Sequence, residues 1–131
     1  MKGKTFKRFE DILAWQLSRE VVREIYRLTN ESGLKKDFAL RDQITRSSVS
    51  VMSNIAEGYE RVSNKEFVQF LNIARGSNSE VKSQLYVMLD VGYIDEISFN
   101  ELYNKCTRIS KILLGLIKHI NDRDENKRFG T

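Results

Sequence analysis

Apolar side chains recur at spacings of three and four residues along almost the whole chain, and no proline interrupts them. Residues at these spacings share one face of an α-helix, and a proline in the interior would break such a helix. The pattern predicts helices at about residues 11–31, 38–59, 64–91 and 99–121. Four long helices with short links favour an all-α fold, an antiparallel up-down-up-down four-helix bundle that forms one domain over residues 1–131.

Capping residues mark the expected helix ends. Ser63 with Glu66, and Ser98 with Glu101, match the capping box, in which the two side chains satisfy free backbone N–H groups of the first turn. Asp37 is the candidate N-cap of the second helix. Glycines stand where the helical pattern stops and are expected to end helices, at Gly33, Gly58 and Gly92.

A polar stripe occupies the middle of the chain, where a small bundle normally has Leu and Ile. Buried polar groups cost stability unless they bond one another, so we expect a hydrogen-bond network that fixes helix register and subunit contacts. A pocket or anion site built on Arg46, Asn54 and Arg75 is the alternative. The expected network consists of Gln43, Arg46, Ser50, Asn54, Glu57, Glu66, Ser77 and Glu80.

Counting equal distances from the expected turns aligns residues on neighbouring helices. Across the corner between the second and third helices, Arg46 lies about one turn from Glu80. We therefore predict that Arg46 pairs with Glu80 or another carboxylate, because a buried guanidinium needs such a partner. Across the next turn Gly76 lies level with Gly115, which predicts a close approach of the two backbones.

The net charge of +4 is mild and is compatible with an anionic partner. A basic arm covers residues 1–9, a charged tail covers 122–131 and is expected to fray, and a ridge of arginines follows the first helix. Glutamates interleave with that ridge, and charged helix faces are often only solvated. The candidate nucleic-acid contacts are Lys2, Lys4, Lys7, Arg8, Arg19, Arg23, Arg27, Lys35 and Lys36.

Targeting and redox signals are sparse. The single cysteine, Cys106, cannot form an intramolecular disulfide and lies in an apolar stripe, so it is expected to be a small buried hydrophobe. The N-terminus lacks the apolar run of a signal peptide, and no window approaches the roughly 18 apolar residues of a membrane span. A cytoplasmic protein without membrane contact is expected.

Catalytic patterns are not evident in the sequence. The only histidine, His119, has Leu116 three positions earlier, whereas a di-iron bundle needs glutamate there. Ser47, Ser48 and Ser50 lack a histidine base nearby in the sequence, and no glycine-rich phosphate loop occurs. The expectation is a protein that is not an enzyme, with no catalytic residue, metal or cofactor.

Five segments together resemble the bacterial four-helix bundle family of 23S rRNA intervening-sequence proteins, over roughly residues 6–120. The most specific is SNIAEGY, and the family often places a proline just before it, where this chain has Met52. The family also favours Gly-Leu where this chain has Ala39-Leu40. The segments are FEDILAWQ at 9–16, QITRSSVS at 43–50, SNIAEGY at 53–59, SNKEF at 63–67 and IARGSNSE at 73–80.

This resemblance implies a bundle that assembles into a ring-shaped homopentamer, and it implies no catalytic residue. Accessory variability proteins of diversity-generating retroelements are similar and bind nucleic acid and a reverse transcriptase. Genes of the family itself lie inside inserts in ribosomal RNA genes. We therefore expect an oligomeric module that binds the backbone of RNA or DNA as an accessory or ribosome-related factor. The alternative is a scaffold for a larger protein partner, without nucleic-acid contact.

Overall fold

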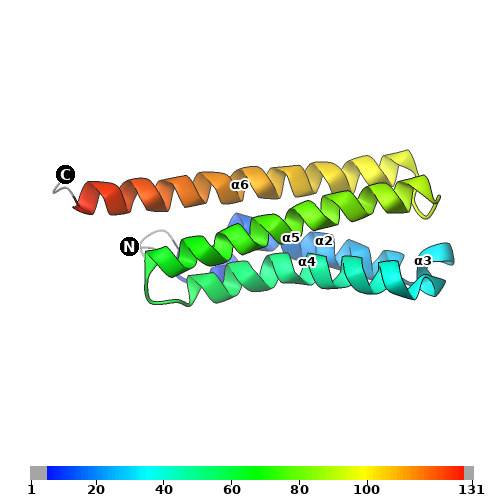
Figure 1. Cartoon of the computed structure of the whole chain (residues 1–131), viewed down its shortest axis with the longest axis horizontal. Coiled ribbons are helices and arrows are strands. Elements are labelled where there is room, and N and C mark those ends of the chain that lie inside the picture. Colours follow the sequence, from blue (N-terminus) through cyan, green and yellow to red (C-terminus); the bar gives the residue numbers. More distant parts are fainter. Residues whose placement is uncertain (1–5, 129–131) are drawn as a thin grey trace.

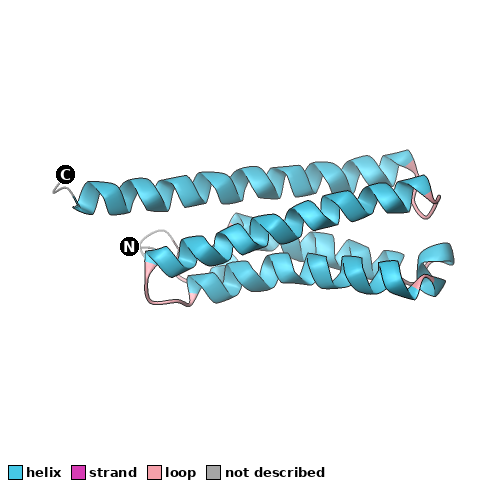
Figure 2. Ribbon diagram, in the orientation of Figure 1, coloured by secondary structure: helices cyan, strands magenta, loops and turns pink. Residues whose placement is uncertain are grey.

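The computed structural model describes residues 6–128, and every regular element in this range is helical (Figure 2). The prediction of an all-helical bundle is therefore confirmed for the described residues. The elements are the one-turn 3-10 helix η1 (Phe9–Asp11), α2 (Leu13–Leu28), the short α3 (Ser32–Lys36), α4 (Phe38–Tyr59), α5 (Asn64–Asp90) and α6 (Glu96–Arg128).

The four long helices lie side by side along the long axis of the molecule (Figure 1). Helix α4 packs on both α2 and α5, and α6 packs on both α5 and α2. Helix α3 lies at the end of the molecule where α2 is joined to α4, and the corner between α4 and α5 lies at the opposite end. The C-terminal part of α6 reaches that corner, where Asn64 Nδ2 donates to Asp124 Oδ1 at 3.0 Å.

All four long helices contribute to one hydrophobic core. Each presents a stripe of aliphatic or aromatic side chains to the centre, as the sequence spacing predicts. Burial of this apolar surface is the main favourable contribution to folding. The largest side chains that are fully buried include Ile25, Ile44, Ile55, Phe67, Leu71, Leu85, Met88, Ile109 and Leu113.

Several helix ends match the predicted caps. Asp37 Oδ1 accepts a hydrogen bond from the Leu40 amide at 3.2 Å, and Ser63 Oγ accepts one from the Glu66 amide at 3.1 Å. Each bond satisfies an amide that the first helical turn leaves free. Gly92 has φ of +81° and ends α5, which is the conformation expected of a glycine after a helix.

The start and end of α6 differ from the prediction. Asp95, not Ser98, caps this helix, because Asp95 Oδ1 accepts the Ser98 amide at 2.8 Å. That hydrogen bond holds the pKa of the Asp95 carboxyl below its ordinary value. The helix therefore begins at Glu96 and continues to Arg128, through most of the tail that was expected to fray.

Glycine packing also differs from the prediction. Gly58 lies inside α4, where an added Cβ would come within 2.6 Å of Phe70 Cβ on α5. Gly76 and Gly115 do not face each other, since an added Cβ at either would meet no atom within 4 Å. The helices α4 and α5 therefore approach each other closely near their shared corner. Gly58 allows this approach because it has no Cβ.

We expect Gly58→Ala to lower the free energy of unfolding by about 1–3 kcal/mol, because the new methyl group would overlap an atom next to the α5 backbone. Gly115→Ala is the matched control. It should leave that free energy unchanged or raise it by up to about 1 kcal/mol, since alanine is the better helix former. Urea unfolding of both variants measures the difference, and equal shifts would contradict this packing.

Candidate functional site

Polar side chains join α4 to α5 along their contact. Ser50 Oγ and Ser77 Oγ lie 2.8 Å apart, and Asn54 Nδ2 donates to the carbonyl and the hydroxyl oxygen of Ser50 at 2.8 and 3.0 Å. Further along, Gln84 Nε2 donates to Ser47 Oγ at 3.2 Å. We call these five residues the α4–α5 seam. They show that part of the predicted polar network forms inside the single chain.

Other members of the predicted network lie on the surface. Gln43, Arg46, Glu57 and Glu80 are exposed. Within residues 6–128 of the single chain, neither Arg46 nor Glu80 takes part in an ion pair, so the predicted pair between them is not formed there. Glu57 instead pairs with Arg61 at 2.6 Å, four residues further on. The stripe faces outward at these positions, and the guanidinium of Arg46 needs no buried partner.

The alternative pocket of Arg46, Asn54 and Arg75 is not assembled. Asn54 belongs to the seam, and Arg75 Nη1 donates to Asn72 Oδ1 on its own helix at 3.3 Å. Arg46 lines a separate cleft of about 330 Å³ together with residues of α2 and α4. These are Tyr26, Asp42, Thr45 and Val49.

The sequence interpretation missed the most buried polar contact between helices. Asn78 is only 1% exposed, and its Nδ2 donates to the Cys106 carbonyl and to Ser110 Oγ, both at 2.7 Å. This amide joins α5 to α6. A signal was present, because the apolar stripe of α5 has a gap between Ala74 and Val81 that Asn78 fills.

The environment of Cys106 agrees with its prediction as a small buried hydrophobe. Its side chain is fully buried, and burial raises the pKa of the thiol to about 12. The thiol is therefore neutral at physiological pH, and a neutral thiol is a poor nucleophile.

The arginine ridge on α2 is only partly free. Arg27 is held by Glu24 and by Glu31, with Arg27 Nη1 at 2.6 Å from Glu31 Oε1. The hydrogen bond from Arg27 holds the pKa of the Glu24 carboxyl below its ordinary value. Two carboxylates thus offset the charge of Arg27 and reduce its attraction for phosphate. Arg19 and Arg23 are exposed, and the Arg19 guanidinium lies 5.9 Å from the centre of the Trp15 ring.

The remaining predicted nucleic-acid contacts lie just before η1 and at the end of α3. Lys7, Arg8, Lys35 and Lys36 are exposed. Arg8 lies 3.6 Å from a carboxylate oxygen of Glu10, a long and solvated ion pair that contributes little. Residues 2 and 4, which carry the other two predicted lysines, lie outside the described part of the chain.

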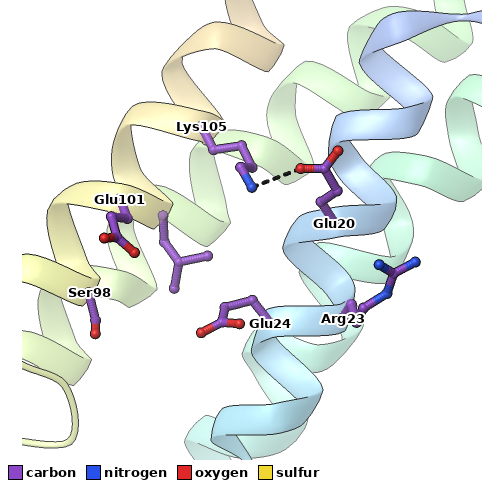
Figure 3. A pocket seen from close by; sticks show the side chains of 7 residues that line it. Glu20, Arg23, Glu24, Ser98, Glu101 and Lys105 are labelled. Carbon is purple, nitrogen blue, oxygen red and sulfur yellow. Dashed lines mark hydrogen bonds and ion pairs between the residues drawn. The ribbon is translucent and has the colours of Figure 1, made fainter.

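A cleft of about 410 Å³ separates part of α2 from α6 (Figure 3). Lys105 Nζ lies 2.9 Å from Glu20 Oε1 and links the two helices across it. The other lining residues are Arg23, Glu24, Ser98, Glu101 and Leu102. Three carboxylates and two cations line this cleft, so its charges do not favour an anionic ligand.

Two further features bear on chemistry. Among residues 6–128, no group of three or more His, Cys, Asp or Glu side chains is arranged to hold a metal ion. Every helix in the same range is too short or too polar to cross a lipid bilayer.

Comparison with known proteins places the chain in a family. The family model described as 23S rRNA-intervening sequence protein matches residues 10–115. Among solved structures, a protein of unknown function from the S23 ribosomal protein family of Bacteroides thetaiotaomicron is 30% identical, with a TM-score of 0.74. The alignment covers 81% of this chain and 99% of that one. No curated protein matches the chain.

Proposed function

Because this chain belongs to the 23S rRNA-intervening sequence protein family, we propose that it is a non-enzymatic helical module that binds the backbone of RNA or DNA. The observation that supports binding is a set of exposed cations that form no ion pair with any carboxylate in residues 6–128. Such free cations attract phosphate and release its counterions. From the predicted set they are Lys7, Arg19, Arg23, Lys35 and Lys36.

The absence of catalysis is part of this proposal. The three serines that sequence reasoning weighed as nucleophiles have hydroxyls engaged in hydrogen bonds. Ser47 Oγ donates to the Gln43 carbonyl and Ser48 Oγ to the Thr45 carbonyl, and Ser50 Oγ lies beside Ser77 Oγ. The partners of these hydroxyls are carbonyls of α4 or a serine of α5, and none of these partners is a base that would activate a nucleophile.

Binding through the phosphate backbone should be tolerant of sequence and sensitive to salt. We expect a labelled single-stranded RNA to bind at about 50 mM salt and to lose affinity steeply toward about 200 mM. A shuffled RNA of the same composition is the control and should bind equally well. Fluorescence anisotropy measures both. If neither RNA nor DNA binds at the lower salt concentration, the result contradicts the proposal.

We also propose the finer architecture, an up-down-up-down bundle that assembles into a homopentameric ring. In Figure 1 the links from α2 to α4, from α4 to α5 and from α5 to α6 lie at alternating ends. Gln43 and Arg46 on α4 and Glu80 on α5 are exposed, and Ile73 on α5 is 51% exposed. A neighbouring copy would complete the bonding of these polar groups and cover the apolar one.

Light scattering tests the ring. The expected mass in solution is five times the 15.3 kDa of one chain. Ile73→Asp should lower that mass, because it places a charge in the proposed contact. Leu114→Asp is the matched control, since Leu114 is also 51% exposed but lies on α6. A wild-type protein with the mass of one chain would overturn the ring.

A protein scaffold without nucleic-acid contact is the second candidate function. The observation that favours it is the exposed apolar surface near the turn between α5 and α6, where Val91 is 55% and Ile97 is 71% exposed. Exposed apolar patches of this kind often mark protein contacts. Failure to bind nucleic acid in the anisotropy titration would favour the scaffold.

A further inference from the structure

The middle of α6 carries cations and no carboxylate. From Leu102 to Asn121 the sequence contains four basic residues and neither Asp nor Glu. This differs from the ridge on α2, where glutamates alternate with the arginines. The basic residues are Lys105, Arg108, Lys111 and Lys118.

Three of these cations have no carboxylate partner in the described part of the chain. Lys105 pairs with Glu20, whereas Arg108, Lys111 and Lys118 are exposed and form no ion pair with any described residue. Their spacings of three and seven residues place them on one side of the helix. They span roughly 15 Å along its axis at about 1.5 Å per residue. We call these three residues the α6 cation row.

The neighbouring flank of α5 adds positive charge. Lys82 Nζ lies 4.5 Å from the centre of the Tyr103 ring on α6. Arg75, seven residues before Lys82, lies on the same flank. The carboxylates closest in sequence to the row are Asp122 and Asp124, beyond its C-terminal end, and Asp124 is engaged by Asn64.

An aromatic cluster lies at the N-terminal end of the row. Tyr86 of α5 has its ring centre 4.8 Å from that of Phe99 and 5.5 Å from that of Tyr103, both on α6. Tyr86 is 48% exposed, so part of its ring is open to a ligand. The sequence alone does not indicate aromatics for contact with bases, because Tyr86 lies on α5 and the other two rings lie on α6.

We propose that a single strand of nucleic acid lies along α6, with its phosphates on Arg108, Lys111 and Lys118 and a base stacked on Tyr86. This rests on the proposed function and names its surface and its substrate class. A row of cations beside an exposed aromatic ring is the combination that binds single strands. A duplex keeps its bases stacked internally and cannot use the ring.

Charge removal tests the cation row. The probe is a labelled oligouridine of about 16 nucleotides. The triple variant Arg108→Gln, Lys111→Gln, Lys118→Gln should bind at least about tenfold more weakly at low salt. Its slope of log affinity against log salt should be shallower by about 2, since each lost phosphate contact on a single strand contributes about 0.7.

The charge-matched control for that variant is the triple substitution Arg19→Gln, Arg23→Gln, Lys36→Gln, which removes three of the exposed cations on α2 and α3 that support the proposed function. It should weaken binding less than the α6 variant does, because these cations attract phosphate from outside the surface proposed for the strand. Loss of binding in this control, with the α6 variant unchanged, would overturn the inference and leave the proposed function standing. A wild-type protein that binds no nucleic acid would contradict both.

Removal of the ring tests stacking. Tyr86→Ala should weaken binding of the oligouridine by about 5- to 150-fold without changing the salt slope, because stacking of one base is worth about 1–3 kcal/mol. Tyr86→Phe keeps the ring and should bind as the wild type does. The affinity for a duplex of the same length should not depend on residue 86. Unchanged binding by Tyr86→Ala, in a variant with wild-type urea unfolding, would overturn the assignment to single strands.

Discussion

Two consecutive polar residues on α5 hold this helix to both of its neighbours. Ser77 Oγ contacts Ser50 Oγ on α4, and Asn78 donates to the carbonyl of Cys106 and the hydroxyl of Ser110 on α6. Apolar contacts alone tolerate small shifts of one helix along another. A buried amide does not, because a shift would leave it without a partner at a cost of about 1–3 kcal/mol.

The register set by Asn78 determines the surface that we propose for nucleic acid. Lys82 lies one turn beyond Asn78 and reaches Tyr103, and Tyr86 lies one turn further and joins the aromatic cluster. If α5 moved by a turn relative to α6, these contacts would be lost. The buried polar contacts and the exposed candidate site are therefore two consequences of one helix alignment.

The sequence predicts helix positions well, because they depend on local spacing. It predicts contacts between helices poorly, because these depend on the direction in which each side chain leaves its helix. The range 38–59 coincides with α4, because periodicity and the Asp37 cap act within a few residues. Counting residues from the turn gives the position of Gly76 and Gly115 along their helix axes. It does not give the direction in which each residue points, and the two glycines do not face each other. Asp95 and Ser98 are both good capping residues, and only the structure shows which one accepts the amide.

The role of the Asn78 amide in aligning α5 with α6 is tested most directly by a double-mutant cycle with Asn78→Ala and Ser110→Ala. Urea unfolding of the wild type, both single variants and the double variant gives the coupling free energy between the two side chains. The expected coupling is about 0.5–1.5 kcal/mol in favour of the intact pair, since the buried amide and the partly buried hydroxyl lie 2.7 Å apart. Strictly additive losses would contradict the account, because the Asn78 amide would then gain nothing from the Ser110 hydroxyl on α6.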